Sequence, residues 1–115
     1  MFTFGILIAV ILAIFTLLSG AATYLPTWFW ALGWLDSIDP ALYRLGFWGF
    51  GHSAQQINLA AMVSIWYLIG TLSVGAVPVS EKLSRIAFLL YLLGINVAAV
   101  HHLLVDPGLS AVSYT

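Results

Sequence analysis

Long apolar runs alternate with short polar connectors along the chain. The runs extend over residues Phe2–Tyr24, Leu45–Val77 and Ile86–Val105, and each ends close to a proline. A helix of about 20 apolar residues crosses the hydrocarbon layer of a membrane. The pattern therefore predicts an all-α transmembrane bundle with spanning helices over about residues 2–25, 45–77 and 84–105. The second run exceeds one crossing, which a tilted helix accommodates.

The two connectors differ in their polar residues. The first, between residues 25 and 44, carries three tryptophans: Trp28, Trp30 and Trp34. Tryptophan favours the headgroup region, so this connector is expected to lie along the membrane interface. The second connector, Pro78–Arg85, holds Lys82 and Arg85 beside one acidic residue. By the positive-inside rule it faces the cytoplasm, and the first connector and the C-terminus then face outward.

The composition excludes several classes of protein. Of 115 residues, 63% are hydrophobic and 6% are charged, with a net charge of -1. The mean hydropathy is +1.08. So little polar surface cannot cover a water-soluble domain of this size, so the expected solvent is lipid. There is no basic patch for nucleic acid, and without cysteine there is no disulfide or thiolate metal site. The N-terminal run lacks a basic start, so a retained helix is expected rather than a cleaved signal.

Three histidines interrupt the apolar pattern: His52, His101 and His102. Histidine is rare at membrane depth without a role, and neutral imidazole suits copper, zinc or iron. The predicted topology brings both histidine groups to similar depth, nearer the outer face. His101 and His102 diverge by roughly 100° on a helix. Both reach one metal only if it sits between them or the helix end distorts; otherwise one is packed and one is interfacial.

One face of the second predicted helix carries further polar groups. Helical spacing aligns His52, Gln56, Leu59, Val63 and Tyr67 in one stripe, and two more amides flank it, Gln55 and Asn58. In a membrane helix such groups are expected to face protein or a cavity rather than lipid. A functional role and interhelical hydrogen bonding alone both fit this stripe. After the third helix, Asp106-Pro107-Gly108 is typical of a helix stop, and Asp106 is either its cap or a partner that orients an imidazole.

A longer pattern resembles a known family. The segment Phe47–His52 reads Phe-Trp-Gly-Phe-Gly-His, and after 48 intervening residues His101-His102 follow. This is similar to the copper-ligand pattern of heme-copper oxygen reductase subunit I, and the downstream Asp106-Pro107-Gly108 is similar to its B-type members. The resemblance runs from about Asp39 onward. It implies that residues 1–115 are a partial cytochrome oxidase subunit I domain, three helices of a bundle of about twelve.

The resemblance implies a function and a set of partners. His52, His101 and His102 would bind the copper that faces a high-spin heme, where dioxygen is reduced to water in aerobic respiration. Tyr67 matches a tyrosine of the B-type proton route, so electron transport would be coupled to proton translocation. The implied partners are the remaining helices or subunits of the complex, membrane lipid, and a donor such as cytochrome c or a small copper protein. The implied location is a prokaryotic plasma membrane.

The chain departs from the family pattern at two positions near His52. Oxidases of the family have a tyrosine, bonded to a ligand imidazole, four residues after the first histidine; it supplies an electron and a proton. Here that position is Gln56. Nitric oxide reductases of the same superfamily lack the tyrosine, so Gln56 indicates either nitric oxide reduction or an oxidase that finds its donor elsewhere. The proline or similar residue that usually follows the histidine is Ser53.

The chain also lacks a histidine for either heme. The resemblance therefore implies a central slice of a subunit, either a fragment or the product of a split gene, inactive alone. A third alternative is a non-catalytic three-helix membrane protein whose histidines are structural.

Overall fold

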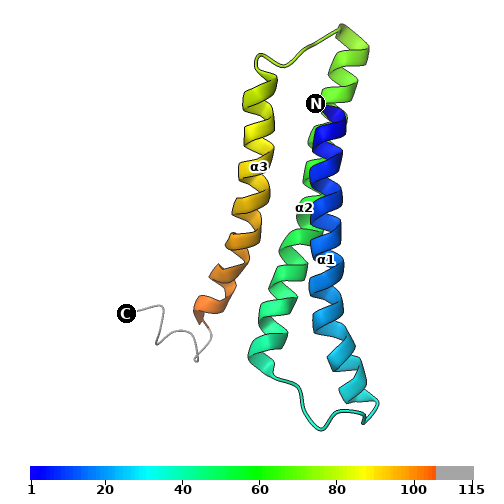
Figure 1. Cartoon of the computed structure of the whole chain (residues 1–115), viewed down its shortest axis with the longest axis vertical. Coiled ribbons are helices and arrows are strands. Elements are labelled where there is room, and N and C mark those ends of the chain that lie inside the picture. The colour runs from blue at the N-terminus through cyan, green and yellow to red at the C-terminus, as the bar shows by residue number, and fades with distance from the viewer. Residues whose placement is uncertain (106–115) are drawn as a thin grey trace.

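The chain folds into an elongated bundle of helices that run in alternating directions. The computed structural model describes residues 1–105, apart from the side chains at positions 99, 103 and 105. Its elements are α1 (Phe2–Ala31), α2 (Pro40–Val74), α3 (Glu81–Ala98) and the 3₁₀ helix η1 (Ala99–Val105). Figure 1 shows the connector between α1 and α2 at one end of the bundle and that between α2 and α3 at the other. Within residues 1–105 there is no strand, and the prediction of an all-α bundle is confirmed.

The first helix is longer than predicted. It was expected to end near residue 25, but α1 continues through Pro26 to Ala31. Proline removes one backbone N–H, and membrane helices tolerate it more readily than helices in water do. Here Thr27 Oγ1 donates to the carbonyl of Thr23 at 2.9 Å, and Thr23 Oγ1 donates to the carbonyl of Ser19 at 2.7 Å. Two of the three connector tryptophans therefore lie on the last turns of α1.

The second helix begins and ends earlier than predicted. Its start was expected near residue 45, but Asp39 caps the helix by accepting bonds from the backbone N–H of Ala41 at 2.8 Å and of Leu42 at 3.3 Å. Pro40 occupies the first turn, where its missing N–H costs nothing. The helix ends at Val74 rather than residue 77, because Gly75 takes a left-handed conformation with φ of 65°.

The third helix begins before residue 84 and changes form before residue 105. Ser80 Oγ accepts a bond from the backbone N–H of Leu83 at 3.2 Å, so Glu81 opens the helix. The α-helix ends at Ala98, and η1 carries the chain on to Val105. The predicted stop at 106–108 lies outside the described residues.

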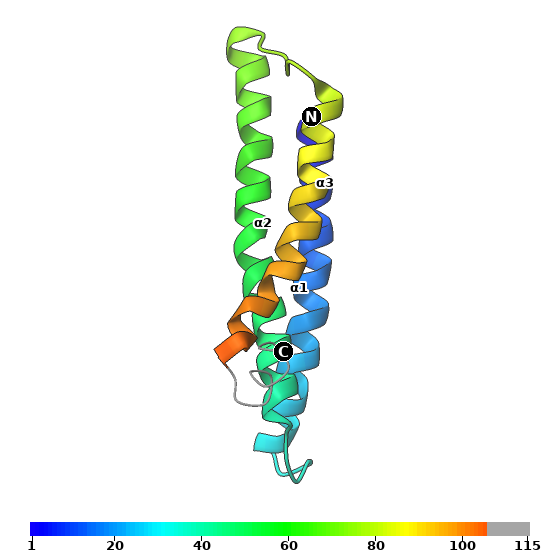
Figure 2. The same cartoon turned by 90° about the vertical axis from the view of Figure 1, so that its left-hand side faces the viewer.

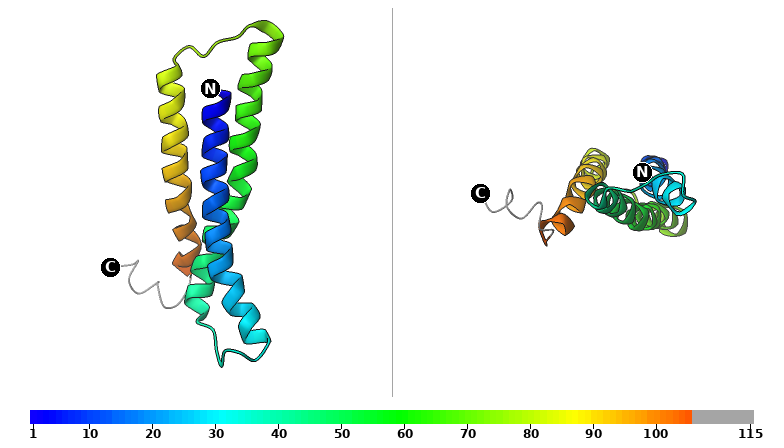
Figure 3. Two further views of the ribbon diagram at one scale, coloured as in Figure 1. Left: turned by 45° about the vertical axis from the view of Figure 1, so that its right-hand side comes forward. Right: turned by 90° about the horizontal axis from the view of Figure 1, so that it is seen from below.

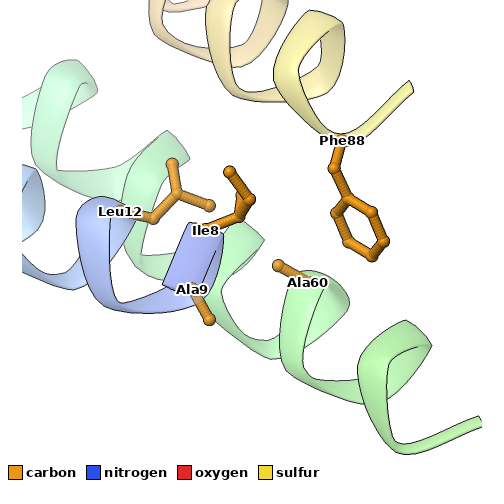
Figure 4. Packing of buried hydrophobic residues seen from close by; sticks show 5 residues of the cluster. All are labelled: Ile8, Ala9, Leu12, Ala60 and Phe88. Atoms are coloured by element: carbon orange, nitrogen blue, oxygen red, sulfur yellow. The ribbon is translucent and has the colours of Figure 1, made fainter. Parts of the chain in front are cut away.

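A small apolar core joins the three helices near the middle of the bundle. Ile8 and Leu12 of α1 are 1% and 0% exposed, and Ala60 of α2 is 1% exposed. Phe88 brings α3 into this core, as the close-up in Figure 4 shows. Most other large apolar side chains on all three helices are exposed. Each helix is long and apolar enough to cross a membrane, and the protein is an integral membrane protein.

The two helix interfaces of α2 differ in kind. Towards α1 the contact is tight: a methyl at Gly46 would collide with Thr23 Oγ1, and one at Gly5 would collide with Ser64 Oγ. Small residues let membrane helices approach this closely. Towards α3 the contact rests on Phe88 and on pairs of polar side chains. In the left panel of Figure 3, α1 follows α2 along its length.

Candidate metal centre

Three imidazoles meet where η1 reaches α2. His52 lies on α2, and His101 and His102 lie on η1. One nitrogen of each imidazole lies within 4.8 Å of one nitrogen of each of the others. Figure 2 shows η1 beside the half of α2 that precedes the middle of the helix. The similar depth expected from the topology is therefore realised in the folded chain.

The consecutive histidines both face His52. Ring centroids of His52 and His101 are 5.3 Å apart, those of His52 and His102 are 4.8 Å apart, and those of the two neighbours are 4.1 Å apart. The sequence analysis required either a metal between the two rings or a distorted helix end. The change from α-helix to 3₁₀ helix at Ala99 is such a distortion. The space between the rings is thus shared by all three side chains.

Trp48 stacks on one of these rings, the imidazole of His102. Its indole stacks on the His102 imidazole with centroids 3.6 Å apart and planes 7° apart. The same indole meets His52 edge-on, with centroids 6.3 Å apart. Trp48 and His52 are four residues apart on α2 and so lie on one face of the helix. Stacking of this kind limits rotation of the His102 ring.

The donor set fits copper. His101 Nδ1 contacts the carbonyl oxygen of Ala98, so that nitrogen is the N–H and Nε2 is left as the ligand atom. Metal–imidazole bonds are about 2.0–2.1 Å, so three nitrogens arranged around one metal are at most about 3.6 Å from one another. The widest separation allowed by the 4.8 Å limit therefore has to close by about 1.2 Å when a metal binds. Three neutral imidazoles suit copper or zinc.

Polar pairs continue from the histidines along α2 and α3. The hydroxyl of Ser53 lies 3.5 Å from Asn96 Oδ1. One turn further, the phenol of Tyr91 donates a hydrogen bond to Gln56 Oε1. Both pairs join α2 to α3. Gln56 thus faces protein, as its place in the stripe predicted.

Tyr67 stands at the far end of the same interface. Its hydroxyl donates to Ser84 Oγ at 3.0 Å. A cavity of about 370 Å³ lies between Tyr67, Ser84 and Tyr91, with apolar walls from both helices. Its volume exceeds that of one water, about 30 Å³ in the liquid, and the hydroxyls of Tyr67, Ser84 and Tyr91 are its polar groups.

The structure adds to the site three residues that the sequence analysis did not assign to it. Gln55 and Asn58 are exposed on α2 within this chain, and their facing protein or a cavity stays a prediction. Trp48 was noted only as part of the Phe47–His52 motif, and neither Tyr91 nor Asn96 was singled out. Counting residues outward from the short α2–α3 connector would have found them, because in antiparallel helices the numbers of facing residues have a nearly constant sum.

A bundle of membrane-length helices that gathers three histidines defines an integral membrane protein with a candidate imidazole metal centre. Residues 1–114 match the family model described as "Cytochrome C and Quinol oxidase polypeptide I", and the chain belongs to this family. It is similar to "Cytochrome c oxidase subunit 1" of Thermus thermophilus, with 35% identity over 80 residues. These residues are 70% of this chain and 14% of that relative, so the chain spans a small part of its length. No solved structure matches the chain.

The resemblance to subunit I of the heme-copper oxidases is confirmed at the level of the family. The B-type subclass and the roles of individual residues stay predictions.

Proposed function

We propose that this chain contributes the copper-binding helices to subunit I of a terminal respiratory oxidase that reduces dioxygen to water. The observation that carries the proposal is the convergence of three imidazole nitrogens within 4.8 Å on a chain of this family. His52 from α2 and the pair His101–His102 from η1 are the proposed ligands. A copper ion facing a high-spin heme supplies the redox chemistry when both are bound.

The residues of the chain hold and orient these ligands. Contact of His101 Nδ1 with the Ala98 carbonyl selects the tautomer that leaves Nε2 available. The indole of Trp48 keeps the His102 ring in one orientation. Because polar pairs hold together the two helices that carry the ligands, the imidazoles are close to one another before metal binds.

Tyr67 is the proposed entry of protons into this part of the enzyme. Its hydroxyl and that of Ser84 form a bonded pair beside the cavity between α2 and α3. Hydroxyl groups can pass a proton on through waters in such a cavity. The same proposal places the partners: other subunits or helices that carry the heme ligands, and an electron donor such as cytochrome c or a small copper protein. With Lys82 and Arg85 on the cytoplasmic side of a prokaryotic plasma membrane, the histidines lie nearer its outer face.

Nitric oxide reduction is the second candidate function, and Gln56 favours it. An amide carries out no redox chemistry, and Gln56 stands one turn after the proposed ligand His52. Reduction of nitric oxide to nitrous oxide needs two electrons and two protons for two molecules, and no O–O bond is broken. A site without a phenol at position 56 is sufficient for that reaction.

Two measurements on the purified native complex test these proposals. Copper is measured by mass spectrometry in the unsubstituted complex and in the His52→Ala variant, with Asn58→Ala as the control because Asn58 is exposed on the same helix. We expect copper to be lost only with His52. Uptake of dioxygen and of nitric oxide is then recorded electrochemically. Oxygen uptake without nitric oxide uptake supports the oxidase, and the reverse supports the reductase. Copper-free complex with an intact fold would support a structural role for the histidines.

A further inference from the structure

Two amide side chains of α2 have no hydrogen-bond partner within residues 1–105. They belong to Gln55 and Asn58, and both are exposed on the surface of the helix. The other hydroxyl and amide side chains between residues 53 and 71 each have a partner in α2 or α3: Ser53, Gln56, Ser64, Tyr67 and Thr71. Gln55 and Asn58 are therefore exceptions on a helix that otherwise satisfies its polar groups.

Both amides lie near the middle of α2. Gln55 is 15 residues from the first residue of the helix, and Asn58 is 16 residues from the last. Each is thus more than about 20 Å from the nearer helix end, whereas half the thickness of the hydrocarbon layer is about 15 Å. A short amide side chain at this depth reaches neither headgroups nor water, and a polar group left unpaired in hydrocarbon is strongly unfavourable. The two amides therefore require hydrogen-bonding groups from outside residues 1–105.

The amides occupy a side of α2 that neither α1 nor α3 covers within the described residues. Gly46 and Ser64 are in close contact with α1. At about 100° per residue, Gln55 and Asn58 point to the opposite side of the helix. Gln56 bonds to α3 and is turned by about 100° from Gln55. The unpaired amides thus belong to a third side of α2.

This third side has the spacing of a surface that packs against another helix. Steps of four and three residues alternate along it, and all but the first of its six residues are exposed: Gly51, Gln55, Asn58, Met62, Ile65 and Ile69. We call these six residues the amide seam. Such spacing forms one continuous line between two helices that cross at about 20°, the common angle between membrane helices. The seam is about 27 Å long, so one helix can lie along it and meet both amides.

We propose that the amide seam binds a transmembrane helix from the remaining part of the complex, and that this helix places an amide, hydroxyl or imidazole group level with Gln55 and Asn58. The inference rests on the proposed function as part of subunit I. The matched segment is 14% of the length of the Thermus thermophilus relative, so most of such a subunit lies outside that segment. Acyl chains of lipids have no hydrogen-bonding groups and do not fit the amides.

The amides also fix how the partner helix is aligned with α2. A single polar residue on a helix-packing seam specifies register in coiled coils, because a shifted partner leaves it unpaired. Here two such residues, Gln55 and Asn58, lie three residues apart, about 4.5 Å along the axis. Met62, Ile65 and Ile69 continue the seam with apolar contacts, which tolerate small shifts. The polar pair therefore selects one alignment of the bound helix.

The first test compares unfolding temperatures of the native complex and of the variants Gln55→Leu and Asn58→Leu. If the amides bond to a helix, leucine leaves the polar group of that helix unpaired, and the unfolding temperature falls by about 2–4 °C for each change. If the amides face lipid, leucine removes a polar group from hydrocarbon and the temperature rises. A raised or an unchanged temperature overturns the proposal. Met62→Leu is the control, because this volume-conserving change on the same seam should alter the temperature little.

The second test identifies the occupant by photo-crosslinking in native membranes. The crosslinking residue p-benzoylphenylalanine is introduced in place of Met62, which leaves both amides intact, and mass spectrometry locates the joined peptide. We expect attachment to a membrane-spanning segment outside residues 1–115 that carries a polar side chain about one turn from the attachment point. Attachment only to lipid, to heme or to a second copy of this chain overturns the proposal. The control position is Val79 in the α2–α3 connector, fully exposed, which should not join the same segment.

This inference and the proposed function can fail separately. Copper content should be the same in both leucine variants as in the native complex, because neither amide belongs to the imidazole cluster. A complex without copper that gives the expected crosslink overturns the metal site and supports the bound helix. A copper-loaded, active complex that is stabilised by both leucine changes overturns the bound helix alone.

Discussion

The Trp48 indole and the His102 imidazole lie face to face, with centroids 3.6 Å apart and planes 7° apart. Stacked aromatic pairs contribute about 0.5–1.5 kcal/mol beyond the area that they bury. If this contact orients a copper ligand, Trp48→Leu should weaken copper affinity about 2–10-fold. The affinity of Trp48→Phe should lie between that of Trp48→Leu and that of the unsubstituted protein. The measurement is competition for copper with a chelator of known affinity.

The control for this prediction is Trp66→Leu, since Trp66 is an exposed tryptophan of the same helix, 59% accessible. That change should leave copper affinity as it was. Equal loss of affinity in both variants would assign the effect to general destabilisation of α2 and remove the orienting role from Trp48.

Gly46 should be intolerant of even a methyl group. The added carbon would collide with Thr23 Oγ1 across the α1–α2 interface. We expect Gly46→Ala to cost about 1–3 kcal/mol of stability, as overpacking does elsewhere. Thermal unfolding of the complex measures the loss. Gly94→Ala is the matched control, because a methyl there meets nothing within 4 Å. Adding Thr23→Ala to Gly46→Ala should recover part of the loss, and no recovery would contradict the proposed collision.

Asp39 should stabilise the start of α2. Its carboxylate accepts two backbone N–H bonds of the first turn. Removal of such a cap costs about 0.5–2 kcal/mol, so Asp39→Ala should lower the unfolding temperature of the complex, and Asp39→Asn should lower it less. Asp36→Ala, in the exposed connector, is the comparison. An equal effect at both positions would show that charge in the connector, and not the cap, is responsible.

Tyr67 and Ser84 should matter for proton transfer rather than for assembly. Tyr67→Phe removes the hydroxyl that donates to Ser84. If protons enter here, turnover should fall at least about tenfold, with a larger solvent isotope effect, since a positioned proton donor contributes 10²–10⁴-fold. Ser84→Ala should cause a smaller loss, because the phenol remains. Proton uptake is followed with a pH-indicator dye in single turnovers. Unchanged turnover in Tyr67→Phe would contradict a role in proton transfer and would leave the Tyr67–Ser84 bond a structural link between α2 and α3.

The helices could be predicted from hydropathy, but their ends depended on local chemistry. Apolar length alone predicted three crossings, whereas the ends are set by Asp39, Ser80 and Gly75. Polar caps are invisible to a hydropathy count, although Asp-Pro before a helix is a recognisable start signal. Continuation of α1 through Pro26 could not be predicted from the sequence pattern, because proline more often marks the end of a helix.

The site could be predicted in part, because the histidines are rare in this composition and their depths follow from topology. The partners of those histidines are harder to predict. Trp48 belongs to an aromatic run in which any ring could face lipid, and only the approach of η1 decides which one stacks on His102. Tyr91 and Gln56 are 35 residues apart in the chain, so their pairing depends on how far α3 is shifted along α2, which periodicity within one helix does not report.

Polar pairing between α2 and α3 has a consequence for how the protein is inserted and assembled. Ser53–Asn96, Gln56–Tyr91 and Tyr67–Ser84 all require the same alignment of the two helices. Sliding α3 by one turn, about 5.4 Å, would separate all of these pairs at once and leave polar groups facing hydrocarbon. Misaligned chains are thus destabilised before any metal binds, and the destabilisation arises along the whole α2–α3 interface, from Ser53 beside the histidines to Tyr67 at the far end. The three hydrogen-bonded pairs between α2 and α3 therefore favour the one alignment of these helices that brings the three imidazoles together.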